Sequence, residues 1–313
     1  MSAPGSEDRS EARTGASVGA QPEGSSVGAR PARASVGARE EGTSAPATEV
    51  AVWAETVGKI FDTRSGVVQA LTDVDLEVAA GEFVSLIGPS GCGKSTLMRL
   101  IADLDTPTEG DLQVFGKSPA QARLDQDYGI AFQQAGLLPW RTVGANIGMA
   151  LELHGMAKAA RRARVAELAE LVGLADFTDS YPDQLSGGMQ QRVAIARALA
   201  EQPRLLLMDE PFGALDEMTR ERMQAELSRI VGESGAAVVF VTHSIPEAVF
   251  LSDRVVVMSP RPGRITDVIG IGIGRDVPRD EALRETAGFF EKVTEVREAL
   301  HGSRVGSGAR ERR

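Results

Sequence analysis

The sequence predicts an α/β fold with a mostly parallel central sheet. Short apolar runs alternate with helical stretches along the chain, and each run has the length of a buried strand. These runs cover residues 83–87, 130–132, 205–208, 238–241 and 255–258. A glycine-rich segment, residues 88–93, separates the first run from a helical segment that begins near Thr96. This order of strand, glycine-rich loop and helix is typical of a sheet that presents a phosphate-binding loop.

The first 48 residues differ in composition from the rest. Residues 1–48 are mainly Ala, Gly, Ser, Arg, Glu and Pro, and a phrase built on Ser-Val-Gly-Ala occurs at residues 16–20, 26–29 and 34–38. With so few large apolar side chains, this segment cannot offset the entropy lost on ordering. We expect a disordered low-complexity tail, and a neutral extension is favoured over a regulatory arm.

A folded domain is expected over residues 49–275. Apolar residues alternate from Val50 to Phe61 and from Val68 to Val78, which is the period of half-buried strands. Between Lys158 and Leu174 they fall at helical spacing, so a helical subdomain is expected at about residues 135–200. A strand-like stretch at residues 265–273 precedes a helical pattern at residues 281–300. Residues 276–313 are therefore expected to form a C-terminal helix and a flexible tail.

Composition restricts the partners and the compartment. The chain has 313 residues with 34 basic and 44 acidic side chains, a formal charge of -10, which gives no electrostatic footprint for binding nucleic acid. Its single cysteine, Cys92, excludes an intramolecular disulfide. No run approaches the roughly 18 apolar residues of a membrane-spanning helix, and the N-terminus lacks the apolar core of a secretory signal. We expect a cytoplasmic protein, with any membrane part supplied by another subunit.

The strongest chemical motif follows the first apolar run. It is a full Walker A loop, which binds phosphate groups through backbone N–H groups, a helix N-terminus and a lysine. Its ATP-binding candidates are Gly88, Pro89, Ser90, Gly91, Cys92, Gly93, Lys94, Ser95 and Thr96, with the Ser95 hydroxyl as a Mg²⁺ ligand. For Cys92, filling the loop is favoured and a reactive thiol is the alternative.

A second motif places two carboxylates at the end of an apolar strand. Residues 205–208 are followed by Asp209 and Glu210, the Walker B arrangement. Asp209 is expected to hold the Mg²⁺ shell, and Glu210 to act as the general base on the attacking water. Together the two motifs predict a nucleotide hydrolase that uses ATP and Mg²⁺.

Between these motifs lies the segment that connects the chain to a family. Residues 185–190, Leu-Ser-Gly-Gly-Met-Gln, resemble the signature of the ABC ATPases, with Met189 as a variation on the commonest form. Ser186 can cap the helix that follows, and the dipole of that helix favours an anion. The resemblance implies a P-loop NTPase fold of ABC type, with a mostly parallel central sheet, an antiparallel β subdomain and a helical signature subdomain. It also implies that Ser186, Gly187, Gly188 and Gln190 contact the nucleotide of a partner protomer in a homodimer.

Other elements of the family occur in order. Gln133 matches the glutamine loop that touches Mg²⁺ and the attacking water, Asp216 matches the D-loop, and His243 matches the switch histidine. The resemblance therefore implies Glu210, His243 and Gln133 as catalytic residues and Ser95, Gln133 and Asp209 as metal ligands. Phe61 is the candidate for stacking on adenine, and Trp53 is the alternative.

The arrangement of motifs indicates an importer motor. The segment between Gln133 and Ser186 is too short for the long coiled coil of DNA-repair relatives, the chain has one Walker A loop and one signature, and it has no fused membrane helices. Segments 136–143, 212–220 and 259–265 look like those of nitrate, sulfonate and taurine importer ATPases. An ABC ATPase that acts on a soluble partner is the alternative.

That resemblance also implies partners and a location. The expected partners are integral-membrane permease subunits and, indirectly, an extracytoplasmic solute-binding protein, with the chain peripheral on the cytoplasmic face of the cell membrane. The transported solute and the permease are left open by the sequence. One departure is Asp103, where relatives commonly have Gly; we expect it to alter local packing without loss of a catalytic group.

Overall fold

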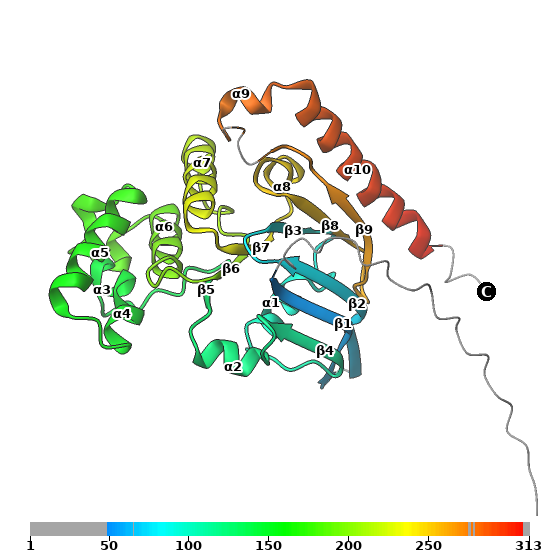
Figure 1. Cartoon of the computed structure of the whole chain (residues 1–313), viewed down its shortest axis with the longest axis horizontal. Coiled ribbons are helices and arrows are strands. Elements are labelled where there is room, and N and C mark those ends of the chain that lie inside the picture. Colours follow the sequence, from blue (N-terminus) through cyan, green and yellow to red (C-terminus); the bar gives the residue numbers. More distant parts are fainter. Residues whose placement is uncertain (1–48, 65, 275–276, 278, 309–313) are drawn as a thin grey trace, which may run out of the picture. The chain divides into compact units, whose positions relative to one another are not determined.

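The computed structural model describes residues 49–64, 66–274, 277 and 279–308 (Figure 1). The predicted low-complexity tail, residues 1–48, lies outside the described residues, as does the end of the predicted C-terminal tail, residues 309–313. In the part of the chain that is described, no helix is both long enough and apolar enough to cross a membrane.

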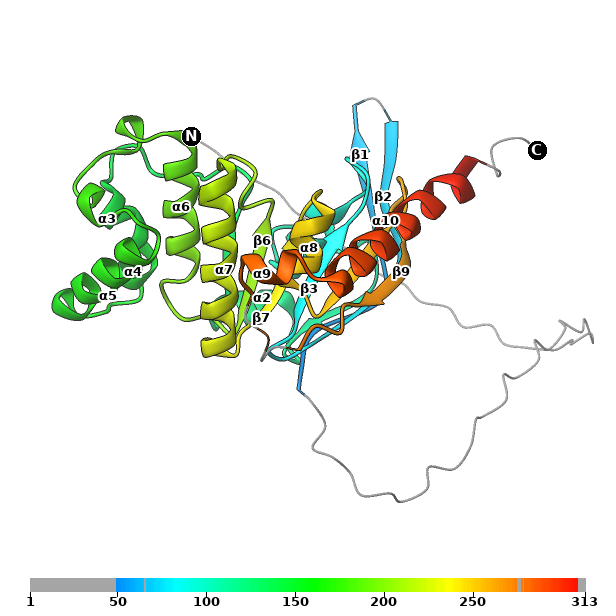
Figure 2. The same cartoon turned by 90° about the horizontal axis from the view of Figure 1, so that it is seen from above.

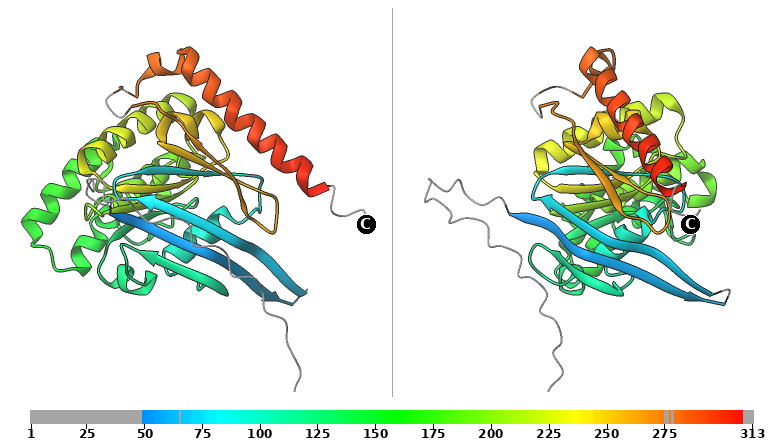
Figure 3. Two further views of the ribbon diagram at one scale, coloured as in Figure 1. Left: turned by 45° about the vertical axis from the view of Figure 1, so that its right-hand side comes forward. Right: turned by 90° about the vertical axis from the view of Figure 1, so that its right-hand side faces the viewer.

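An antiparallel three-stranded sheet forms the first layer. It consists of β1 (Val50–Thr63), β2 (Gly66–Ala79) and β4 (Glu109–Val114), in the order β2-β1-β4. Figure 3 shows β1 and β2 as two long strands that lie side by side. Buried and exposed residues alternate in β2 from Thr72 to Val78, which confirms the alternation read from the sequence there. In β1 the prediction of alternation is wrong, because the register shifts along the strand and neighbouring residues such as Ala51 and Val52 are both buried.

A six-stranded sheet forms the centre. Its strands are β3 (Phe83–Ile87), β5 (Tyr128–Ala131), β6 (Leu205–Asp209), β7 (Ala237–Val241), β8 (Arg254–Met258) and β9 (Ile265–Gly270). The order is β5-β6-β7-β3-β8-β9, with parallel pairing from β5 to β8 and an antiparallel edge strand, β9. Every predicted run lies in a strand, although β5 ends before Phe132 and β9 ends before Ile271.

Each face of the central sheet has its own apolar core. Along β3, Phe83 and Ile87 point into one core, and Val84 and Leu86 point into the other. The second core is shared with helix α1 (Lys94–Ile101), the short helix at residues 119–124 and the three-stranded sheet, and the first with the helices that follow β5 in the chain. Burial on both faces explains why these strands are continuous apolar runs rather than alternating ones.

A group of helices interrupts the sheet between β5 and β6, and Figure 2 shows it to one side of the strands. It contains α3 (Val143–Ile147), α4 (Met149–Leu153), α5 (Lys158–Leu171) and α6 (Gly187–Ala198), with short 3-10 turns at Ala175–Phe177 and Pro182–Gln184. A further short helix, α2 (Pro119–Leu124), follows β4. The predicted helix at residues 158–174 is present, but it ends at Leu171 because Gly173 has a positive φ of 66° and stops it.

The remaining helices are α7 (Glu217–Ser234), α8 (Ile245–Leu251), α9 (Glu281–Arg284) and α10 (Ala287–Gly308). The prediction of one continuous helix over residues 281–300 is wrong, because the chain forms two. The Thr286 hydroxyl donates to Leu283 O at 2.8 Å and accepts from Phe289 N at 3.3 Å, so it ends α9 and caps α10. Beyond the break, Val293 and Val296 bury one face of α10 on the domain, as expected.

Asp103 has a backbone conformation that suits glycine, the residue expected at this position in relatives. Its φ is 49°, in the left-handed region that glycine adopts most readily. The Asp103 carboxylate is paired with an arginine in this conformation, because Arg123 Nε of α2 donates to its Oδ2 at 2.9 Å. The expected change in local packing is therefore an ion pair between the end of α1 and α2.

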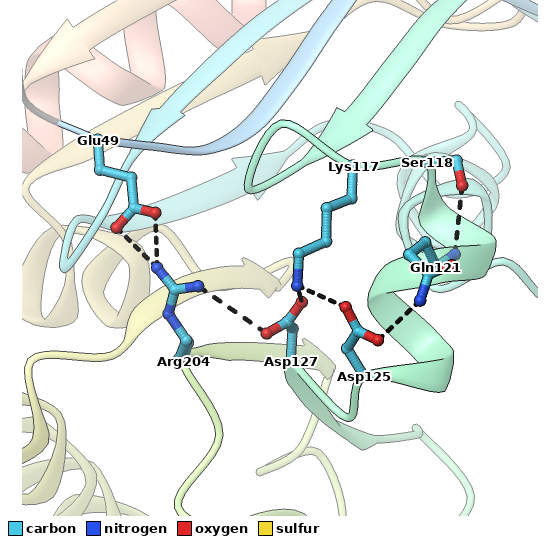
Figure 4. A network of polar contacts seen from close by, with 7 residues as sticks. All are labelled: Glu49, Lys117, Ser118, Gln121, Asp125, Asp127 and Arg204. Atoms are coloured by element: carbon cyan, nitrogen blue, oxygen red, sulfur yellow. Dashed lines mark hydrogen bonds and ion pairs between the residues drawn. The ribbon is translucent and has the colours of Figure 1, made fainter.

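A network of ion pairs connects the amino ends of β5 and β6 (Figure 4). Lys117 Nζ lies 2.7 Å from Asp125 Oδ2 and 2.7 Å from Asp127 Oδ2. Arg204 Nη2 lies 2.6 Å from Glu49 Oε2, while its Nη1 lies 3.9 Å from Asp127 Oδ1. Because Glu49 precedes β1 and Lys117 follows β4, the network ties the three-stranded sheet to the central sheet.

Candidate active site

The Walker A loop lies at the carboxyl end of β3 and leads directly into α1. Gly93 precedes α1 with φ 103°, and a Cβ there would lie 2.5 Å from Leu71 Cδ2. Gly263 closes the loop from the other side, where a Cβ would lie 1.9 Å from Cys92 O. Both positions therefore require glycine, and the loop is fixed between β2 and the turn that follows β8.

Lys94 is folded over this loop. Its ammonium Nζ donates to Gly88 O at 2.9 Å and to Pro89 O at 3.2 Å, and the side chain is only 7% exposed. Among the described residues no carboxylate is an ion-pair partner of this ammonium, and a buried ammonium held by neutral carbonyl oxygens is a strong site for an anion. Cys92 is buried against the same group, with Sγ 3.8 Å from Nζ.

Ser95 and Asp209 meet across the ends of α1 and β6. The Ser95 hydroxyl donates to Asp209 Oδ1 at 3.1 Å. Burial raises the pKa of Asp209, with a further rise from the neighbouring Glu210 charge, while the Ser95 bond and Lys94 act in the opposite direction. A buried carboxylate with a perturbed pKa beside a phosphate-binding loop is typical of a functional site.

Glu210 receives two side chains on one carboxylate oxygen. Gln133 Nε2 donates to Glu210 Oε2 at 3.1 Å, and His243 Nδ1 lies 3.2 Å from the same oxygen. Glu210 itself has φ 46°, a strained conformation for a residue other than glycine, and its backbone N donates to Val241 O at 2.8 Å. The residues predicted from three separate segments of the sequence thus meet at one carboxylate.

A cavity of about 440 Å³ opens beside this carboxylate. Its lining includes Glu210, Thr242, His243, Arg220 of α7 and Arg297 of α10. The space, the carboxylate and the Walker loop lie at the same edge of the sheet, where parallel strands present their carboxyl ends. The arrangement can place an activated water beside a bound phosphate group.

Comparison with known proteins identifies the family to which this site belongs. Residues 71–213 match the family model described as "ABC transporter". An uncharacterized ABC transporter ATP-binding protein of Methanocaldococcus jannaschii is 48% identical over 248 residues, which is 79% of this chain and 91% of that protein. The chain belongs to the ABC transporter family. It is the ATP-binding subunit, an ABC ATPase.

Two other relatives carry the names of importers. The taurine import ATP-binding protein TauB of Yersinia pestis is 44% identical over 238 residues, which is 74% of this chain and 87% of that protein. The nitrate import ATP-binding protein NrtD of Synechocystis is 42% identical over 250 residues, which is 79% of this chain and 93% of that protein.

A solved structure agrees in fold. The ATP-binding cassette MJ0796, solved as a dimer in a post-hydrolysis state with ADP and Pi, has a TM-score of 0.65 and 36% identity, and the match covers 70% of this chain and 98% of that chain. The predicted α/β fold of ABC type is therefore confirmed.

The signature segment of this ABC ATPase begins α6. Ser186 caps the helix by accepting from Met189 N at 3.2 Å. Gln190 turns back instead and donates to Pro182 O at 2.8 Å, so its amide braces the preceding turn. Gly188 approaches Ala214 O closely, since a Cβ there would lie 3.2 Å from it. Ser186 and Gly187 are exposed at the surface.

Helix α6 also holds the glutamine loop. Gln191 Nε2 donates to Phe132 O at 2.9 Å, and Arg197 donates to Gly136 O at 3.0 Å and to Ala135 O at 2.8 Å. Burial lowers the pKa of Arg197. The backbone on both sides of Gln133 is thus fastened to the helix that begins with the signature.

Asp216 caps α7. Its Oδ1 accepts from Thr219 N at 3.0 Å, and this backbone hydrogen bond lowers the pKa of the carboxyl group. The carboxylate is exposed, so it is available to a neighbouring protein chain as well as to its own helix. Its contacts place Asp216 at the surface rather than among the residues around Glu210.

Phe61 and Trp53 lie at different places on β1. Lys59 pairs with Leu71, the residue that contacts Gly93, and Lys59 Nζ lies 4.9 Å from the centre of the Phe61 ring. Trp53 pairs with the exposed residues Glu77 and Gln113 on the outer face of the sheet. Phe61 therefore lies closer along β1 than Trp53 does to the strand position that pairs with Leu71.

Sequence reasoning missed two residues that shape the loop, Leu71 and Gly263. Leu71 appeared only as one member of an apolar alternation, because nothing in the sequence shows what it packs on. Gly263 lay in a segment used only for its likeness to relatives, and a single glycine after a proline gave no stronger signal. Both act by close approach across the fold, which becomes visible once the strands are placed.

Proposed function

We propose that this ABC ATPase is the motor of an importer for a small solute such as nitrate, a sulfonate or taurine. The sequence segments that look like such importers support the proposal, as do the importer names of TauB and NrtD. The cargo among these solutes is left open, because the solute is recognised by other subunits.

The cluster at Glu210 carries the catalytic part of the proposal. Glu210 is the general base that takes a proton from the attacking water, while Gln133 and His243 orient that carboxylate and the water through Oε2. Residues 88–96, with Lys94 at their centre, bind the phosphates, and Phe61 stacks on adenine. Burial raises the pKa of Asp209, and a cation bound beside this carboxylate would lower the pKa again and favour the ionised form.

The donor set near Ser95 fits Mg²⁺. A hydroxyl, a carboxylate and an amide oxygen from Ser95, Asp209 and Gln133 are the oxygen ligands that this ion prefers. When bound with the nucleotide, the ion neutralises negative charge on the phosphates. Two of these three ligands already lie side by side, because the Ser95 hydroxyl donates to Asp209 Oδ1 at 3.1 Å.

The signature residues are proposed to act on the nucleotide bound by a second copy of the chain. We propose a head-to-tail homodimer in which Ser186, Gly187, Gly188 and Gln190 contact the partner's nucleotide and Asp216 lies at the interface. In this arrangement residues 135–200 are the helical subdomain, and the dimer docks on integral-membrane permease subunits at the cytoplasmic face of the membrane. An extracytoplasmic solute-binding protein delivers the cargo.

Copurification from the native host tests this proposal. The tagged chain is extracted with its membranes in mild detergent, and its partners are identified by mass spectrometry. Recovery of a multi-spanning permease supports the importer and narrows the cargo. Recovery of soluble partners alone contradicts the importer and favours an ABC ATPase that acts on a soluble protein.

A further inference from the structure

The ring of His243 is not held by packing. Its side chain is 70% exposed, and its contact with the protein is through Nδ1 to the Glu210 carboxylate. The ring of an exposed residue is aimed mainly by its backbone, so the position of His243 depends on the turn formed by residues 242–244.

The Thr242 hydroxyl fixes that turn. It donates to Glu247 Oε2 and accepts from Ser244 N at 3.0 Å. Thr242 is 1% exposed, so both bonds are made away from competing water. The hydroxyl therefore joins the backbone after His243 to a buried carboxylate.

Glu247 uses both carboxylate oxygens in this way. It is 6% exposed, and Oε1 accepts from Gln224 Nε2 of α7 at 2.8 Å while Oε2 accepts from Thr242. At its position in α8, a Glu side chain ordinarily accepts from the backbone N–H of the capping residue. Here that N–H, of Ser244, goes to Thr242 instead, so the carboxylate serves the turn before the helix.

The chain of contacts continues to α9. Gln224 is 2% exposed, and its Oε1 accepts from Arg284 Nη2 at 2.5 Å. The Arg284 guanidinium stacks on Phe250 of α8 at 4.0 Å, and its Nε lies 3.7 Å from Glu221 Oε1. Figure 1 and Figure 2 show α9 beside α7 and α8.

We propose that Glu247, Gln224 and Arg284 position His243, and that ATP turnover therefore depends on the docking of α9. The three side chains are positioning residues, because they act through Thr242 and the turn rather than on the nucleotide. The inference rests on the proposed role of His243 in hydrolysis.

The direction of the hydrogen bonds makes the proposal testable. The Gln224 amide must present its amino group to Glu247 and its oxygen to Arg284. With Glu247→Gln, the new amino group faces either the Gln224 amino group or the Thr242 hydroxyl, and in the second case that hydroxyl loses the oxygen to which it donates. Turning the Gln224 amide over only moves the mismatch to Arg284. Adding Gln224→Glu restores every contact, because a carboxylate at position 224 accepts from both neighbours.

The experiment compares steady-state ATP turnover, ATP binding and melting temperature across a set of variants. Glu247→Gln and Arg284→Ala are expected to lower kcat about tenfold, the size expected for loss of a buried hydrogen bond. Gln224→Glu alone is also expected to lower it, because two buried carboxylates would then lie side by side. The double variant is expected to recover kcat, and ATP binding is expected to stay unchanged in all four.

Two controls separate the possible failures. Lys292→Ala removes a surface ion pair of α10 with Glu295, at 2.8 Å, and is expected to leave kcat unchanged. His243→Ala with wild-type turnover would contradict the proposed role of His243 itself. If His243→Ala is inactive while folded Arg284→Ala turns over normally, or if the folded double variant does not recover, the positioning role is wrong.

Discussion

Charged side chains lie at the amino ends of β5 and β6 (the amino edge of the central sheet) and at the carboxyl end of β6 (the carboxyl edge), and these charges are balanced in different ways. At the amino edge, Asp127 is paired with Lys117 and Arg204, and Lys117 with the hydrogen bond from Gln121 lowers the pKa of Asp125. At the carboxyl edge, burial and Glu210 raise the pKa of Asp209.

Burial is the main cause of the difference in pKa, and the two edges also differ in where the nearest lysine is bound. Lys94 donates to the carbonyl oxygens of Gly88 and Pro89, whereas Lys117 at the amino edge lies between two carboxylates. One edge is therefore neutralised within the protein and the other leaves its charges for a ligand. The comparison teaches that acidic residues at a strand end indicate a functional site when the nearest lysine donates to backbone oxygens instead of forming an ion pair with them.

The largest expected effect separates the two edges by activity. Glu210→Gln is expected to lower kcat about 10²- to 10⁴-fold, because an amide cannot accept the proton of the attacking water. ATP binding and the ATP-stabilised dimer are expected to persist, and turnover assays with size-exclusion chromatography measure both. Asp125→Asn makes the same chemical change at the amino edge and is expected to leave kcat unchanged. Wild-type turnover in Glu210→Gln would contradict the assignment of the base.

A smaller effect is expected at the amino edge, and on stability. Asp127 is 8% exposed, and Asp127→Asn weakens its contacts with Lys117 and Arg204. Because the Lys117 side chain is 34% exposed, solvent reduces the value of the pair, and we expect the free energy of unfolding to fall by about 1–2 kcal/mol. Denaturant titration measures it. A loss of kcat per folded molecule would break the distinction between the edges.

The pH dependence of stability sharpens the comparison further. Because the pKa of Asp209 is raised on folding from 3.8, the folded protein holds this proton more tightly than the unfolded chain does. The stability that the proton contributes is present below pH 3.8 and is lost as pH rises through the raised folded value. In the absence of nucleotide, the melting temperature is therefore expected to fall as pH rises, and Asp209→Asn is expected to make this fall smaller. An unchanged pH profile would show that Asp209 is not the group responsible.

The smallest effect is expected at Asp103, which lies at neither edge. Asp103→Gly relieves a left-handed conformation but loses the Arg123 ion pair, whose side chains are 49% and 21% exposed for Arg123 and Asp103. The two changes oppose each other, so we expect a gain in unfolding free energy of at most about 1 kcal/mol. Thermal melting checks it, with Arg123→Ala as the control that removes the pair alone.

The sequence predicts which residues gather around Glu210, because each of them lies at the end of a strand that the apolar pattern already places. Gln133, Asp209, Glu210 and His243 follow apolar runs, and parallel strands bring their carboxyl ends to one edge. The fold class follows from the same pattern.

Other features depend on side chains that approach each other from distant parts of the chain. Arg284 reaches Gln224 from 60 residues away, and Gly263, in the turn after β8, lies against Cys92 in the loop after the neighbouring strand β3. The division of α9 from α10 was also missed, because one threonine hydroxyl at position 286 outweighs a helical apolar pattern that continues on both sides. Helical spacing shows which face is buried but not where a short polar side chain ends the helix.

Because the glutamine loop is hydrogen-bonded to α6, a movement of this helix displaces the signature and the glutamine loop together. Ser186 caps one end of the helix, and Gln191 and Arg197 on its body donate to the backbone on both sides of Gln133. In the proposed dimer, a force applied to the helical region would move Gln133 in one catalytic centre and Ser186 at the opposite one in the same stroke. The rigid helix alone would then couple the two catalytic centres, so that both change at the same time.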